Sequence, residues 1–113
     1  MGRREAASLG SIAAVTRRTV QIHPAALEEA GAAADRYMEH SRRAAERFLA
    51  ELGRAIERVS EHPEQFPAFV FETRRMVLPK FPYVIVFRET ASTVDIIAVA
   101  HGRRRPGYWR DRA

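Results

Sequence analysis

The last third of the chain carries its clearest hydrophobic pattern. Two apolar runs, Tyr83–Phe87 and Val94–Ala100, are rich in Val, Ile and aromatic residues, which suit the pleated, half-buried surface of a sheet. The polar stretch between them, Arg88–Thr93, is short enough to be the loop of a β-hairpin. A further strand is predicted at Thr73–Leu78, before a Pro-rich turn. The pattern therefore predicts three antiparallel strands in a meander.

The first half of the chain predicts a strand and then a helix. Val20 and Ile22 alternate with polar residues, which is the period of a strand with one buried face. Pro24 ends this strand and begins a helix, with Glu28 and Glu29 expected in its first turn, where they complement the helix dipole. The apolar stripe expected on this helix consists of Leu27, Ala30, Ala34, Tyr37 and Met38.

A second amphipathic helix follows with almost no linker. We expect Ser41 to cap its N-terminus and the pair His62-Pro63 to end it. Its charged side chains fit a solvated face. Its apolar stripe consists of Ala45, Phe48, Leu49, Leu52, Ala55, Ile56 and Val59. In the loop beyond it, Phe66, Phe69 and Phe71 are interpreted as aromatic caps of the core.

These elements predict an α+β fold. The N-terminal strand and the three-stranded meander are expected to form one antiparallel sheet, and the helical hairpin to pack against one side of it. Residues 19–113 are expected to be a single domain, because a chain of 113 residues supports one core. Residues 1–18 lack periodicity and are interpreted as a flexible arm or as an annotation extension. In the second case translation starts at a residue such as Val15, and residues 1–14 are not native.

Composition narrows the classes of partner. The chain has 19 Lys and Arg against 14 Asp and Glu, for a net charge of +5. Lys80 is the single lysine, and arginine suits planar recognition of carboxylate or phosphate. A G+C-rich genome also explains many arginines, but not their clustering. The chain has no cysteine, which excludes disulfides, and its apolar runs are far shorter than the roughly 20 residues of a membrane span. We expect a cytoplasmic protein without membrane contact.

The arginines cluster where the second hairpin strand ends. His101 and Gly102 break this strand, and the next residues are basic and then aromatic. We expect this end of the sheet to carry the function. The residues assigned to a target-binding surface are Arg103, Arg104, Arg105, Tyr108 and Trp109. An alternative for the last two is that they pack the tail onto the fold.

The order of elements and several short motifs resemble the RelE/ParE superfamily of bacterial type II toxins. The motifs are Phe81-Pro-Tyr with the strand up to Arg88, and His101-Gly-Arg-Arg-Arg-Pro106 with Trp109. The resemblance covers Thr19 to Trp109 and is closer to the ParE-like branch, the plasmid stabilisation toxins. It implies a toxin neutralised by a cognate antitoxin. ParE-type members poison DNA gyrase, whereas RelE-type members cleave messenger RNA on the ribosome. We expect no cofactor.

A ribonuclease needs a general base, a general acid and cations for the phosphate. The candidates are His101 as acid or base, the arginines Arg75, Arg88 and Arg103 as phosphate ligands, and Tyr108 as a donor, with Arg74 and Lys80 as further cations. The single lysine and the scarcity of carboxylates near the sheet put this activity in doubt. We therefore expect an inhibitor that acts by binding.

Two alternatives concern single residues and the whole domain. His101 also fits a structural role, in which it bonds the backbone at the turn of Gly102. His23, His40 and His62 lie at the ends of elements without metal-ligand spacing, and we assign no metal. A third hypothesis for the chain is a basic domain that binds nucleic acid alone.

Overall fold

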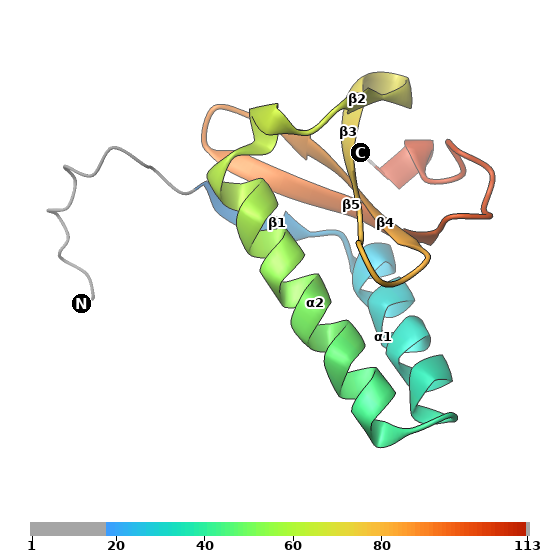
Figure 1. Cartoon of the computed structure of the whole chain (residues 1–113). Coiled ribbons are helices and arrows are strands. Elements are labelled where there is room, and N and C mark those ends of the chain that lie inside the picture. The colour runs from blue at the N-terminus through green and yellow to red at the C-terminus, as the bar shows by residue number, and fades with distance from the viewer. Residues whose placement is uncertain (1–17, 113) are drawn as a thin grey trace, which may run out of the picture.

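The computed structural model describes residues 18–112 as a twisted sheet with two helices against one face (Figure 1). The helices and strands are β1 (Thr19–Ile22), α1 (Pro24–Met38), α2 (Arg42–Glu61), β2 (Ala68–Phe69), β3 (Thr73–Val77), β4 (Tyr83–Glu89) and β5 (Thr93–His101). The predicted α+β fold is confirmed. Of the predicted N-terminal arm, only Arg18 is described, and its amide donates to the carbonyl of Ser60; residues 1–17 lie outside the described residues.

The sheet has the strand order β1-β5-β4-β3-β2. The meander β3-β4-β5 is antiparallel as predicted, but β1 pairs parallel to β5, with Val20 opposite Val94. The prediction of a wholly antiparallel sheet is therefore wrong at this edge. Between β1 and the meander the chain passes through both helices, a connection long enough for parallel pairing. The unpredicted strand β2 has two residues, too few to show a period.

The predicted hairpin is correct, but its strands are longer than the apolar runs. Arg88 and Glu89 continue β4 and pair with Asp95 and Val94. The loop shrinks to residues 90–92. Polar side chains at the end of a strand do not interrupt its backbone pairing, so hydrophobicity alone underestimates strand length. The opposite error occurs at β3, which ends one residue before the predicted Leu78.

Helix α1 buries only part of its predicted stripe: Ala30 is buried and Ala34 and Tyr37 pack against the core, but Leu27 and Met38 do not. Leu27 and Met38 are 61% and 52% exposed, and the buried residues are Ala26, Ala30 and Ala33. Small side chains let the helix lie close to β5, so the longest apolar residues need not face the core. Because the helix begins at Pro24, its two glutamates lie beyond the first turn, which corrects that prediction too. In β1 the predicted alternation also fails at Ile22, which is exposed at the sheet edge.

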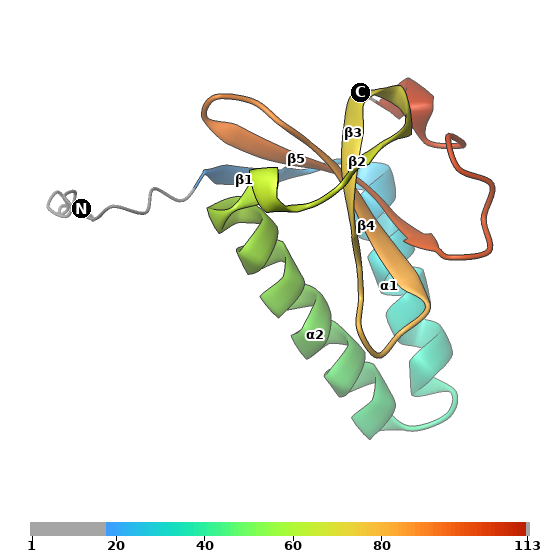
Figure 2. The ribbon, with the colours of Figure 1, turned by 45° about the horizontal axis from the view of Figure 1, so that its top comes forward.

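Helix α2 follows its predicted pattern closely. The hydroxyl of Ser41 accepts the amide of Ala44 at 2.9 Å, as a cap should. Phe48 and Val59 of this helix are fully buried against the sheet. Leu49 is the exception in the predicted stripe, because it points outward and is 49% exposed. Both helices run beside each other across the same side of the sheet (Figure 2).

The other face of the sheet is covered by the C-terminal tail, residues 102–112. Val84 and Val86 of β4 face this side, where Trp109 packs against Ile97 and Ala98. A bulge in β5, opposite Val86 of β4, turns the two successive residues Ile97 and Ala98 toward the tail. Trp109 is 1% exposed. The interpretation that this residue packs the tail onto the fold therefore agrees with the structure.

Candidate functional site

The tail leaves β5 through a turn in which backbone amides donate hydrogen bonds to His101 and Pro82. Nδ1 of His101 accepts the amide of Arg103 at 3.0 Å, and its carbonyl accepts the amide of Arg104. The amide of Gly102 donates to the carbonyl of Pro82 at 2.8 Å. These bonds are the structural role considered for His101. They fix the direction in which the three successive arginines leave the sheet.

Several guanidinium groups near this turn lie over aromatic rings. The guanidinium carbon of Arg104 is 3.8 Å from the ring centre of Tyr108, and that of Arg75 is 4.7 Å from the ring centre of Phe69. A stacked guanidinium keeps its N–H edges free for an anion while its position is restricted. We call the group the arginine–aromatic surface. It consists of Arg75, Arg104, Arg105 and Arg110 with Phe69, Phe71 and Tyr108.

A small pocket of about 60 Å³ lies at the centre of this surface. It brings together most of the residues that the sequence singles out, and among the described residues no Asp or Glu lines it. The predicted residues that line it are Arg75, His101, Arg104, Arg105, Tyr108 and Trp109. The pocket can bind a small anionic group, but it offers no carboxylate as a general base.

Other predicted residues lie elsewhere. Arg103 is exposed beside the pocket without lining it. Arg88 is directed to the loop before β3, where it donates to the carbonyl of Phe71 at 2.9 Å. Arg74 is occupied by an ion pair with Glu89 at 2.8 Å, and Lys80 lies in the turn between β3 and β4. The structure thus does not assemble the predicted set of phosphate ligands at one place.

The aromatic caps are divided in the same way. Phe66 packs edge-on against Phe87 with ring centres 6.0 Å apart, as expected for a cap of the core. Phe69 and Phe71 instead pack against Trp109 of the tail. Phe71 has a left-handed backbone and is 46% exposed. These two rings therefore belong to the arginine–aromatic surface rather than to the main core.

Glu29 anchors the tail, which the sequence reasoning missed. Its carboxylate accepts two bonds from Arg112 at 3.0 Å and one from the hydroxyl of Tyr108 at 2.7 Å. It also accepts the amide of Val99, on the part of β5 that β1 no longer covers. We call these four residues the Glu29 cluster. Glu29 lies on the same helical face as Ala26 and the other buried alanines, where a carboxylate requires partners, but the sequence alone does not show that these alanines are buried.

The electrostatics of the Glu29 cluster follow from these bonds. Partial burial acts to raise the pKa of Glu29, but the bonds from Arg112, Tyr108 and Val99 outweigh it and hold that pKa below its usual value. Burial, together with the bond to Glu29, raises the pKa of Tyr108 to about 12. The hydroxyl of Tyr108 is therefore committed to holding the tail, although its ring lines the pocket.

The part of the chain from 18 to 112 contains no group of three or more His, Asp and Glu residues placed to hold a metal ion. No helix in that part is long and apolar enough to cross a bilayer. The arrangement is therefore an exposed, positively charged and partly aromatic surface, whose arginines are suited to binding carboxylate or phosphate groups.

Comparison with known proteins agrees with the resemblance seen in the sequence. A family profile described as "ParE toxin of type II toxin-antitoxin system, parDE" matches residues 20–106. Among solved structures, a chain of the "Chromosomal ParDE TA system from P. aeruginosa" superposes with a TM-score of 0.67 at 16% identity, covering 75% of this chain and 96% of that one. No curated protein matches in sequence. The chain belongs to the ParE toxin family of type II toxin–antitoxin systems.

Proposed function

We propose that the chain inhibits bacterial growth by binding and poisoning DNA gyrase in the cytoplasm, and that a cognate antitoxin neutralises it. The observation that supports this most is the arginine–aromatic surface, whose guanidinium groups lie exposed over aromatic rings. Such a surface binds carboxylate or phosphate groups through guanidinium contacts, and this binding requires no chemical reaction. The choice of gyrase as the target comes from the ParE-like resemblance.

The same geometry favours binding over catalysis. His101 lines the pocket, but its Nδ1 accepts the amide of Arg103. The hydroxyl of Tyr108 donates to Glu29. A ribonuclease needs both a base and an acid at the reacting phosphate, and the pocket lining supplies one free ring nitrogen. The toxin therefore acts on its target without a reaction of its own.

One observation favours the alternative, a RelE-like messenger RNA endonuclease. His101 lines the same pocket as Arg75 and Arg104, a combination that fits a phosphate beside a proton carrier. The experiment is a paired assay on the purified protein. One arm measures supercoiling and cleavage-complex formation by gyrase, and the other follows message cleavage in a translating extract. Gyrase inhibition with intact message supports the proposal, and message cleavage with normal gyrase activity overturns it.

Charge removal at the tail tests which surface meets the target. We expect the triple substitution Arg103→Ala, Arg104→Ala, Arg105→Ala to weaken gyrase inhibition at least about ten-fold, since each arginine supplies a charge-assisted contact. A control that removes two charges elsewhere is Arg42→Ala with Arg43→Ala, two exposed arginines at the start of α2, which should inhibit like the wild type. Fluorescence of Trp109 confirms in both that the tail stays packed. Equal inhibition by the triple variant would contradict the site.

The third hypothesis, binding to nucleic acid alone, predicts a steep salt dependence. A domain that neutralises several phosphates loses affinity linearly on a logarithmic scale of salt concentration. Binding to a short duplex, measured from low to physiological salt without gyrase, separates this hypothesis from the proposed one. Tight and strongly salt-dependent binding, together with normal gyrase activity, would favour it.

A further inference from the structure

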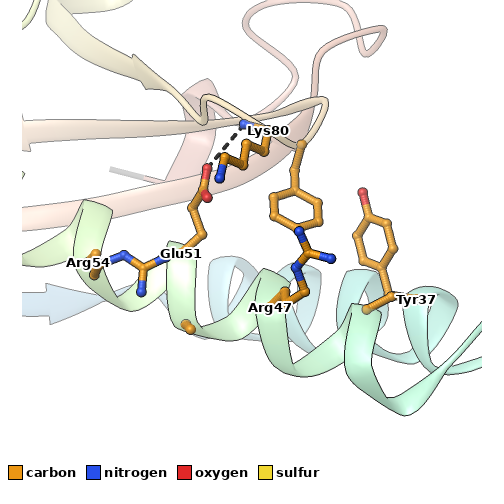
Figure 3. A pocket seen from close by; sticks show the side chains of 8 residues that line it. Tyr37, Arg47, Glu51, Arg54 and Lys80 are labelled. Atoms are coloured by element: carbon orange, nitrogen blue, oxygen red, sulfur yellow. Dashed lines mark hydrogen bonds between the residues drawn. The ribbon is translucent and has the colours of Figure 1, made fainter.

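A second open pocket lies on the helical side of the molecule, between α2 and the turn that joins β3 to β4. Its volume is about 400 Å³. Arg47 and Arg54 reach it from α2, and Lys80 reaches it from the turn (Figure 3). The sequence singles out Lys80 and Phe81 for other reasons, but the arginine–aromatic surface shares no residue with this pocket.

The three cations of this pocket lack partners of their own. Within residues 18–112, the side chains of Arg47, Arg54 and Lys80 form no hydrogen bond or ion pair. The one carboxylate there, Glu51, accepts the backbone amide of Lys80 at 3.1 Å. Three cations and one carboxylate leave a net charge of +2 at the pocket. Elsewhere on the same helix, by contrast, Arg42 is paired with Glu46 at 3.2 Å.

The wall of the pocket is apolar and firmly packed. Phe81 and Tyr37 line it, and their ring centres are 5.2 Å apart in an edge-on arrangement. Both rings also pack against the buried Phe48. A site with a rigid aromatic wall and unpaired cations at its rim suits a segment that carries both apolar and acidic side chains. A bare phosphodiester would not use the apolar wall and would meet the carboxylate of Glu51.

A glycine beside the pocket provides independent support. Gly53 lies in the interior of α2, where glycine costs about 1 kcal/mol relative to alanine. A Cβ placed there meets nothing within 4 Å, so packing inside this chain does not require it. Ala50, which lines the pocket, lies three residues before it and is its neighbour on the helix surface. Because both residues have small side chains, the backbone of another chain can approach the helix closely at this point.

We propose that this pocket is the docking site for an acidic segment of the antitoxin. An apolar side chain of the segment packs against Phe81, and its carboxylates pair with Arg47, Arg54 and Lys80. The turn that carries Lys80 is bonded to the start of the tail through the carbonyl of Pro82 and the amide of Gly102, which links the backbone of the two sites. This inference rests on the proposed function, which supplies the antitoxin.

The test measures antitoxin affinity and toxicity separately. The probe is the purified product of the gene that adjoins the coding sequence of this chain, titrated calorimetrically at two salt concentrations. We expect Arg47→Ala with Arg54→Ala to raise the Kd at least about ten-fold and to reduce its salt dependence, because two carboxylates lose their partners. The double variant Arg42→Ala, Arg43→Ala removes the same charge outside the pocket and should bind like the wild type.

Each outcome has one meaning. A Kd unchanged by the pocket substitutions overturns the inference, as does failure of the adjoining gene product to bind the wild type. If the pocket variant loses gyrase inhibition but keeps its Kd, the pocket belongs to the target surface and the inference is wrong. If gyrase is never inhibited yet the Kd rises, the proposed target fails and the docking site stands. As a second variant, Gly53→Trp should weaken binding while leaving gyrase inhibition intact.

Discussion

The two faces of the sheet are covered by different means. On the helical face, Phe48, Leu52 and Val59 of α2 meet Ile85 and other strand residues in one continuous apolar core. On the other face, Trp109 packs on a few small and β-branched side chains, and the tail is otherwise tied down by the Glu29 cluster. The first face holds the fold together. The second is a smaller unit that carries the proposed binding surface, and we expect it to loosen before the rest of the fold.

The largest effect is expected from the helical face. Phe48 is fully buried and contacts three other aromatic rings, so Phe48→Ala should lower the free energy of unfolding by about 3–5 kcal/mol. Urea denaturation checks this with two probes, far-UV circular dichroism for the helices and fluorescence of Trp109, the single tryptophan, for the tail. Both transitions should move together. Leu49→Ala, at an exposed position of the same helix, should change stability by only about 0.5 kcal/mol.

The Glu29 cluster should give the next largest effect, confined at first to the tail. Glu29→Gln leaves the guanidinium of Arg112 without its ion pair, and we expect a loss of about 1–3 kcal/mol. Fluorescence of Trp109 should report release of the tail at lower urea concentration than the loss of helical signal. The control Glu28→Gln changes an exposed neighbour and should leave both transitions in place. Coincident transitions in the Glu29 variant would show that the two faces are one unit.

The same cluster predicts a pH dependence with a definite sign. Because the pKa of Glu29 is held below its ordinary value of 4.5, its contribution is fully present above that value and disappears as the pH falls through the lower folded pKa. The tail transition of the wild type should therefore shift to lower urea as the medium is acidified. The difference between wild type and Glu29→Gln should shrink over the same range. A constant difference would mean that Glu29 holds the tail without its charge.

A smaller and more local effect is expected where the tail crosses the loop before β3. Gly107 has a φ of +94°, and a Cβ there would lie 2.6 Å from Cε2 of Phe71. Gly107→Ala should thus destabilise the tail by about 1–2 kcal/mol, displace the ring of Phe71 and weaken gyrase inhibition. Gly102→Ala is the matched control, because its Cβ would meet Pro82 at an ordinary 3.6 Å. Trp109 fluorescence and the supercoiling assay measure both variants.

The two faces also differ in how far the sequence predicts them. The strands of the meander and the inner face of α2 follow from local periodicity, and both are confirmed. Only part of the buried face of α1 does, because nothing in the local sequence distinguishes the buried Ala26 and Ala33 from exposed alanines. The Glu29 cluster joins residues 83 positions apart, and no local pattern indicates that pairing. The second pocket likewise depends on the turn of Lys80 meeting α2.

The smallest expected effect comes from a comparison of the two helices. Gly31 in α1 and Gly53 in α2 both lie in helix interiors with open space at the Cβ position, so changing either to alanine should stabilise the fold by about 0.5–1 kcal/mol. Thermal unfolding should show equal gains for the two variants. Their affinity for the adjoining gene product should differ only when the new side chain is large. Gly53→Trp should then weaken binding and Gly31→Trp should not, because only Gly53 neighbours the unpaired cations of α2; equal losses would place the partner across both helices rather than in the pocket.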